Sequence, residues 1–211
     1  MSAATTETLD AKRNPMWSSG YGHDAIATKT LGFWLYMLSD AMMFTALFVA
    51  YTVLGHTFNA AGGPWATAVA HPGTAFKETV WLFSSVLAYG FAMIALKKGS
   101  RSGVMLGIAA ALVIALGFLA VDAHEVMTLF RMGATPERSG FLSAFFTLVF
   151  YHGLHVVVGI AWMLVMLVQV AAAGLTEKVV YRLLNLRLFW HFQAVMWVFM
   201  FTFLYLRGAI V

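Results

Sequence analysis

Cysteine is absent from this chain of 211 residues. Its absence excludes disulfides, thiolate metal sites, iron–sulfur ligation and the haem attachment of a C-x-x-C-H motif. Charge is also scarce. Asp, Glu, Lys and Arg make up 10% of the residues, whereas a soluble domain carries roughly 25%. Because 61% of the residues are hydrophobic, the composition excludes a water-soluble globule and indicates an integral membrane protein.

Five apolar segments are long enough to cross a bilayer as helices, which takes about 20 residues each. They cover residues 31–54, 79–96, 104–121, 140–169 and 188–206. Residues 1–30 are polar and are predicted to form a cytoplasmic tail, and no internal repeat or soluble domain is evident. The predicted fold is therefore an all-α integral membrane protein, with a five-helix bundle over residues 31–211.

The basic residues are distributed unequally between the two ends of this predicted bundle. Four lie on one side, at Lys77, Arg131, Arg138 and Arg207, and the other nine of the thirteen lie opposite. The positive-inside rule then places the N-terminus in the cytoplasm and the C-terminus in the periplasm. The net charge of +4 is explained by this bias, so we expect no binding of nucleic acid.

The segment 140–169 contains no Asp, Glu, Lys or Arg, but it carries a stripe of other functional side chains. The stripe repeats at steps of three and four, which places its members on one helix face: His152, His155, Gly159, Trp162, Met166 and Gln169. A histidine pair at this spacing could bind a metal, and His155 with His191 could ligate a membrane haem. His191 lies near the cytoplasmic start of its span, however, so the depths match poorly. We predict hydrogen bonding between helices instead.

Asp40 lies near the middle of the first span. A carboxylate at that depth costs about 3 kcal/mol on insertion scales, so it must be protonated, paired or wet. It could be part of a proton relay, or it could be a buried acid that fixes helix packing. Because no second acid falls within the hydrocarbon part of a predicted span, the packing role is favoured. We expect Asp40 to pair with His152 or His155, which lie at similar depth.

The remaining acids are expected near the membrane surfaces. Glu78 should start a helix, where negative charge suits the helix dipole. Asp122 and Glu125 should reach the headgroup region, and histidines such as His71 are expected to be solvated and to bind no metal. The aromatic residues Trp162, Trp190 and Trp197 are expected to contact neighbouring helices or lipid.

Three segments together resemble one known family. They are LGFWLYMLSDAMMFTALFVAY in the first span, SGFLSAFFTLVFYHGLHVVVGIAW in the fourth and LFWHFQAVMW in the fifth. The chain is similar to subunit III of the haem–copper respiratory oxidases, and most similar to the five-helix form in cytochrome bo-type ubiquinol oxidases. The resemblance covers the chain from about residue 30 to the end.

The resemblance assigns several positions. Asp40 takes the place of the family's acid in the first helix of this form, and Glu78 that of an acid at the start of the next. Two further motifs match, the first at His152, Gly153, His155 and Gly159 and the second at Trp190, His191 and Trp197. The family usually has an acid where this chain has Ala194, so that acid's polar contact is absent or is replaced by Gln193.

The resemblance also implies a role. This chain would carry no active site, haem or copper, since both cofactors belong to the large subunit I. Its expected partners are subunits I, II and IV and phospholipid, in a bacterial inner membrane. The complex would oxidise ubiquinol, reduce oxygen to water and pump protons, and this subunit would stabilise the catalytic subunit and retain lipid.

Three alternatives remain open from the sequence. The chain could be subunit III of a cytochrome c oxidase, for which a copper-binding Cys/His set in subunit II would be diagnostic. It could be a bis-histidine haem membrane protein, which would show a haem absorption band on its own. It could also be a proton-coupled transporter, although the absence of repeats and of broken helices argues against this.

Overall fold

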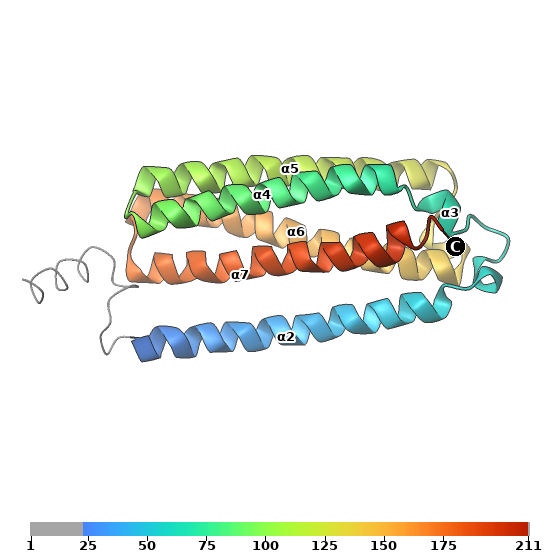
Figure 1. Cartoon of the computed structure of the whole chain (residues 1–211), viewed down its shortest axis with the longest axis horizontal. Coiled ribbons are helices and arrows are strands. Elements are labelled where there is room, and N and C mark those ends of the chain that lie inside the picture. Colours follow the sequence, from blue (N-terminus) through green and yellow to red (C-terminus); the bar gives the residue numbers. More distant parts are fainter. Residues whose placement is uncertain (1–22, 211) are drawn as a thin grey trace, which may run out of the picture.

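Five long helices dominate the computed structural model, which describes residues 23–210 (Figure 1). They are α2 (His23–Leu54), α4 (Pro72–Lys97), α5 (Arg101–Arg131), α6 (Gly140–Ala173) and α7 (Glu177–Met200). The last helix continues as a π-helical segment, η3 (Phe201–Leu206). Three short helices lie in the connections: η1 (Thr57–Ala60), α3 (Ala66–Val69) and η2 (Pro136–Arg138). The predicted tail falls mostly on residues 1–22, which lie outside the described part.

All five long helices are long and apolar enough to cross a membrane. The predicted class, an all-α membrane bundle, is therefore confirmed. The helices extend beyond the apolar segments: α4 starts at residue 72 rather than 79, and α5 ends at 131 rather than 121. The reason is that hydropathy marks only the stretch with the length of the hydrocarbon core, whereas backbone hydrogen bonding continues until a cap or a turn ends it.

The helix ends carry recognisable signals. Pro72 stands in the first turn of α4, where its missing N–H costs nothing. The hydroxyl groups of Ser100 and Ser139 accept hydrogen bonds from Gly103 N and Leu142 N, and so cap α5 and α6. Gly174 follows α6 with a φ of 68°, a left-handed value that favours glycine. Capping by these residues fixes where the long helices turn back.

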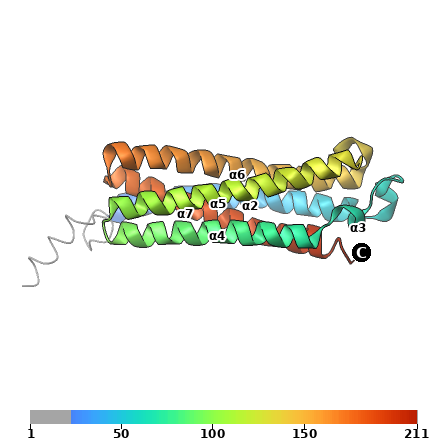
Figure 2. The ribbon, with the colours of Figure 1, turned by 90° about the horizontal axis from the view of Figure 1, so that it is seen from above.

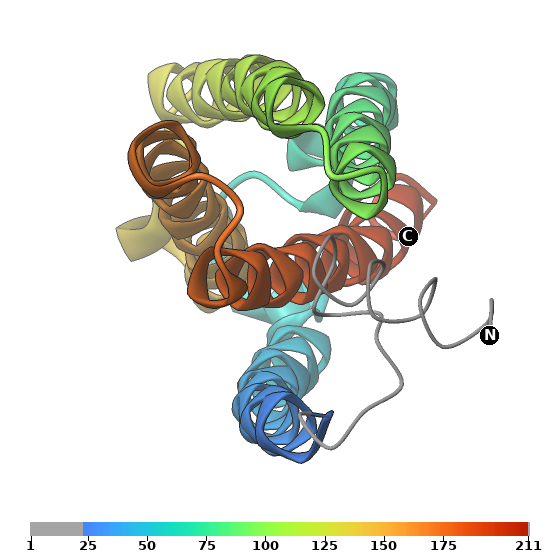
Figure 3. The ribbon, with the colours of Figure 1, turned by 90° about the vertical axis from the view of Figure 1, so that its left-hand side faces the viewer.

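Helices α4, α5, α6 and α7 surround a common interior, and α2 lies outside this group against α6 and α7 (Figure 3). The helices run nearly along one axis (Figure 2). The α4–α5 and α6–α7 turns share one end of the bundle, and the C-terminal end of η3 lies at the other, with α3 (Figure 1).

Glycines allow the helices to approach one another closely. A Cβ atom added at Gly107 would lie 2.6 Å from the Cβ of Ala92, and one at Gly117 would lie 2.6 Å from the ring of Trp81. Both contacts join α5 to α4, the most extensively packed pair in the fold. Small residues at such positions are a common means of packing membrane helices.

Candidate functional site

The contact between α2 and α6 is centred on Asp40. Its Oδ1 atom accepts a hydrogen bond of 2.8 Å from the hydroxyl of Tyr151 and lies 3.2 Å from Nε2 of His155. Asp40 is only 6% exposed. Of the two partners expected for Asp40, the structure thus brings His155 into contact.

The protonation of this contact follows from its hydrogen bonds. Nδ1 of His155 lies 2.7 Å from the carbonyl oxygen of Tyr151. A carbonyl only accepts, so Nδ1 carries the proton of that bond. The contact between Nε2 and Asp40 then needs a second proton between the two groups, because two acceptors would otherwise face each other. Asp40 and His155 therefore form an ion pair or a neutral hydrogen-bonded pair, and both forms carry no net charge.

Aromatic rings enclose this pair. Phe44 of α2 contacts Tyr151 at 4.8 Å and His155 at 5.5 Å between ring centroids. Phe189 of α7 stacks on His155 at 6.2 Å. The second carboxylate oxygen of Asp40 is shielded from solvent and has no hydrogen-bond partner among the described residues. The site holds three helices together around one polar contact.

His152 faces the interior of the four-helix group instead of α2. It is fully buried, and its Nε2 donates to the carbonyl oxygen of Gln193 on α7, 3.3 Å away. Its ring packs against Phe118 of α5 and Trp197 of α7. The side chain thus makes a contact between helices, of the kind expected from the sequence.

Two tryptophans connect α7 to α4. The indole N–H of Trp190 donates to Ser85 Oγ at 3.2 Å, and that of Trp197 donates to Thr79 Oγ1 at 2.9 Å. Ser85 in turn donates to the carbonyl oxygen of Ala111 on α5. These buried indoles find hydrogen-bond partners in neighbouring helices, so they serve packing. Trp162 is half-buried between the rings of Phe33 and Phe189.

The stripe on α6 therefore serves as the contact of this helix with α2 and α7. A Cβ atom added at Gly159 would lie 2.6 Å from the ring of Trp190, so only glycine leaves room there. At the end of the stripe, Oε1 of Gln169 accepts from Arg182 at 2.8 Å. His191 differs: it is exposed, and its hydrogen bond stays within α7, at the carbonyl of Arg187. The structure gives it no part in this contact.

Three further acids are more buried than the sequence indicated. Glu78 was expected at a helix start, which is wrong, because it lies in the second turn of α4 and is fully buried. Asp122 and Glu125 were expected to continue the helix toward the membrane surface; α5 does continue past them, and both side chains are buried within the chain. The sequence carried a signal for this burial. Asp122 and Glu125 are three residues apart, so they continue one face of the helix beyond Val121. Asp40 is thus not the only acid buried within a long helix.

Ala194, where the resemblance led us to expect an acid, is buried as well. Ala194 is 5% exposed, and the amide of the neighbouring Gln193 has no hydrogen-bond partner among residues 31–210. Gln193 contributes its backbone carbonyl to His152 instead. Over the same residues, no three His, Asp or Glu side chains are arranged to hold a metal ion.

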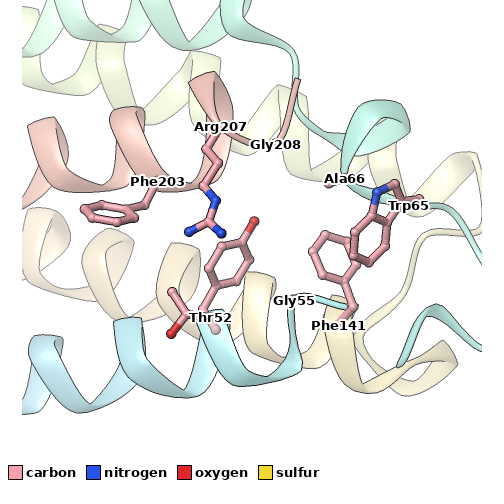
Figure 4. Close-up of a pocket in the computed structure, with 9 residues that line it drawn as sticks. Thr52, Gly55, Trp65, Ala66, Phe141, Phe203, Arg207 and Gly208 are labelled. Carbon is pink, nitrogen blue, oxygen red and sulfur yellow. The ribbon is translucent and has the colours of Figure 1, made fainter. Parts of the chain in front are cut away.

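Two hollows adjoin along α2 and the C-terminal segment. An open groove of about 300 Å³ is lined by apolar side chains of α2, α7 and η3, among them Phe48, Val49 and Phe199. A smaller cavity of about 40 Å³ lies at the end of the bundle, where Arg207 points toward the residues around Thr52 (Figure 4). Thr52 and Phe203 line both hollows.

Comparisons with known proteins cover nearly the whole chain. The profile of the family described as cytochrome c oxidase subunit III matches residues 17–209. A protein of Pseudomonas putida named cytochrome bo(3) ubiquinol oxidase subunit 3 is 40% identical over 188 residues, which are 89% of this chain and 90% of that protein. Its namesake in Pseudomonas aeruginosa is 37% identical over 190 residues, 90% of each chain. A Bacillus sp. (strain PS3) protein named cytochrome c oxidase subunit 3 is 33% identical over 182 residues, 86% of this chain and 87% of that one.

Proposed function

The chain belongs to the cytochrome c oxidase subunit III family, and from this we propose that it is the accessory third subunit of a ubiquinol oxidase. The family resemblance expected from the three sequence segments is thereby confirmed. The observation that carries the proposal is the identity with the two Pseudomonas proteins over nine-tenths of each chain, since both are named as subunit 3 of a ubiquinol oxidase.

In this role the chain supports chemistry that takes place in its partners. We assign haem and copper to the large subunit I, and we expect subunits II and IV in the same complex. The described side chains favour such a supporting role. Asp40, His152, Trp190 and Trp197 each form a hydrogen bond to a neighbouring helix.

The proposal includes a location and an orientation. The complex would lie in a bacterial inner membrane, with the end of the bundle that carries Lys97, Lys98 and Arg101 in the cytoplasm. The positive-inside rule supports this assignment, because most of the basic residues gather at that end.

Purification through a tag on this chain tests the function. We expect the chain to bring down a large haem-containing subunit with a smaller subunit that lacks a copper-binding Cys/His set. The complex should consume oxygen with ubiquinol and not with reduced cytochrome c. Turnover with cytochrome c would instead favour the activity in the name of the Bacillus sp. (strain PS3) relative. A haem band in the purified chain alone would contradict the accessory role.

Lipid retention is the second part of the proposed role. The groove between α2 and α7 is open and apolar, which suits an acyl chain, and Arg207 and Thr52 line the adjoining cavity, which suits a lipid headgroup. Replacing Val49, which lines the groove, with Trp should lower the number of phospholipids that stay bound to the purified complex. Val53→Trp is the matched control, because Val53 is similarly exposed on the same helix outside the groove. Equal lipid content in the two variants would contradict lipid binding in the groove.

A further inference from the structure

A second group of buried acids lies between α4 and α5, well apart in sequence from the Asp40 contact. Glu78 of α4 is 0% exposed, and Glu125 and Asp122 of α5 are 7% and 8% exposed. All three lie toward the helix ends that face α3 and the C-terminus (Figure 1). None of them takes part in the contacts that support the proposed function.

The carboxyl groups of Glu78 and Glu125 lie close enough to each other to interact electrostatically. Both oxygen atoms of each carboxyl are shielded from solvent, and none of the four accepts a hydrogen bond from a protein donor among residues 31–210. A buried carboxylate without a donor is costly. Two carboxylates in contact cannot both be ionised, because they repel strongly where water is excluded.

Protein cations do not relieve this repulsion. The titratable groups that face the pair are Asp122 of α5, Tyr205 of η3 and His71 just before α4. Asp122 adds negative charge, and Tyr205 is neutral when protonated. No Lys or Arg among the described residues forms an ion pair with either glutamate at 4.0 Å or less. His71 can counter the charge of Glu125 only when the imidazole is itself protonated. The cluster therefore needs a bound proton, on the carboxyl pair or on His71, to offset its negative charge.

His71 links the pair to water. Its Nδ1 atom lies 3.5 Å from Oε1 of Glu125, and its side chain is 44% exposed. An imidazole can accept a proton from water on one nitrogen and release one from the other, which makes histidine suited to proton transfer near neutral pH. The contact thus joins a carboxyl without solvent access to a side chain that has it.

We propose that Glu78 and Glu125 form a buried site that binds one shared proton, and that His71 exchanges this proton with the aqueous phase at the C-terminal end of the bundle. The proton lies between one oxygen of each carboxyl group, so that the pair carries a single negative charge. A metal cation is less suited to the site, because the side chains there do not converge as a metal-binding group. The site is independent of the proposed accessory function.

Infrared spectroscopy of the full-length chain in lipid nanodiscs tests the shared proton. A protonated carboxyl gives a C=O stretching band that shifts in D₂O. Glu78→Gln and Glu125→Gln should each abolish the band of the pair, because the remaining carboxyl then accepts from the amide and ionises. The double variant should lose no more of the C=O band intensity than either single variant. Glu137→Gln is the control, since Glu137 is an exposed acid and should leave the band unchanged.

Other results would overturn the proposal. Additive losses in the two single variants would mean two independently protonated acids, and no loss would mean that neither is protonated. A band that disappears on adding Na⁺ or Ca²⁺ would identify a cation site. For the exchange step, His71→Ala should keep the band but slow its shift after transfer to D₂O. An unchanged rate would remove His71 from the pathway.

Discussion

Asp40 illustrates how a single polar contact fixes a helix in a membrane. Tyr151 and His155 both reach the same oxygen of Asp40 from α6. Aromatic rings pack around the three side chains and limit the access of water to the hydrogen bonds. In membranes such contacts contribute modestly, about 0.6 kcal/mol on average and up to about 1.7 kcal/mol.

Replacement of Asp40 tests this contact. Asp40→Asn keeps an acceptor for Tyr151 but removes the carboxyl group that pairs with His155. We expect a loss of roughly 0.5–2 kcal/mol in stability, measured by thermal unfolding in detergent, with less chain recovered in the oxidase complex. Tyr151→Phe is the comparison, because it removes one hydrogen bond and leaves the contact between Asp40 and His155, and its loss should be smaller. Wild-type stability in the Asn variant would show that the pair does not hold α2 on α6.

Gly159 is the position where packing leaves least room on α6. In Gly159→Ala, the new methyl would lie 2.6 Å from the Trp190 ring, so α6 and α7 must separate. Such overpacking costs about 1–3 kcal/mol. Gly153→Ala on the same helix is the control, because the nearest atom there is 3.7 Å away, an ordinary contact. Thermal unfolding should give a lower melting temperature for Gly159→Ala than for Gly153→Ala. Equal melting temperatures would contradict the close approach of α6 and α7.

At the scale of elements, the four inner helices and α2 are held differently. Helices α4, α5, α6 and α7 share an interior crossed by hydrogen bonds from Trp190, Trp197 and Tyr89, which donates to the carbonyl of Leu183. Helix α2 instead packs mainly against α6 and α7, on their outer faces. The packing of α2 therefore depends on few side chains, and among them Asp40 is the buried residue with a charged or polar group.

A double-mutant cycle measures the link between α4 and α7. Trp197→Phe removes the indole donor, and Thr79→Val removes its acceptor. Because the two side chains are bonded at 2.9 Å, the loss in the double variant should fall short of the sum of the single losses by about 1 kcal/mol. Unfolding of the four proteins under one denaturant gives this coupling. Strict additivity would show that the hydrogen bond contributes nothing.

At the scale of the whole molecule, the two ends of the bundle differ in charge. The turns between α4 and α5 and between α6 and α7 share one end (Figure 1), and they carry the basic residues Lys97, Lys98, Arg101 and Lys178. The other end holds Lys77, Arg131, Arg138 and Arg207 together with the acids Glu78, Asp122 and Glu125. This asymmetry supports the proposed orientation, with the turns in the cytoplasm.

Cysteine labelling tests that orientation, and the cysteine-free chain provides a background without other thiols. A membrane-impermeant maleimide added to intact cells should label Glu137→Cys, at the end with η2, and not Ser102→Cys, in the first turn of α5. Both positions are exposed in the structure. Labelling after cell lysis controls for reactivity and should reach both. The reverse pattern in intact cells would invert the topology.

Much of the site was predictable from residues alone, because its signals are local. The stripe from His152 to Gln169 follows from helical spacing, and the depth of Asp40 follows from its place in an apolar segment. The choice between His152 and His155 as its partner was not predictable. It depends on how α6 is rotated, since the two side chains point to different neighbours, His155 to α2 and His152 to α5 and α7.

The sequence by itself determined the membrane class, the number of spans and the family, because scarce charge and long apolar runs admit only helices across a bilayer. Only the tertiary structure decided which polar groups meet. Glu78 and Glu125 are 47 positions apart in the sequence, and each taken alone is typical of a helix end near water. They become a buried pair because α4 and α5 extend past the apolar segments and pack closely together. That contact arises from helix length and mutual rotation, which hydropathy does not record.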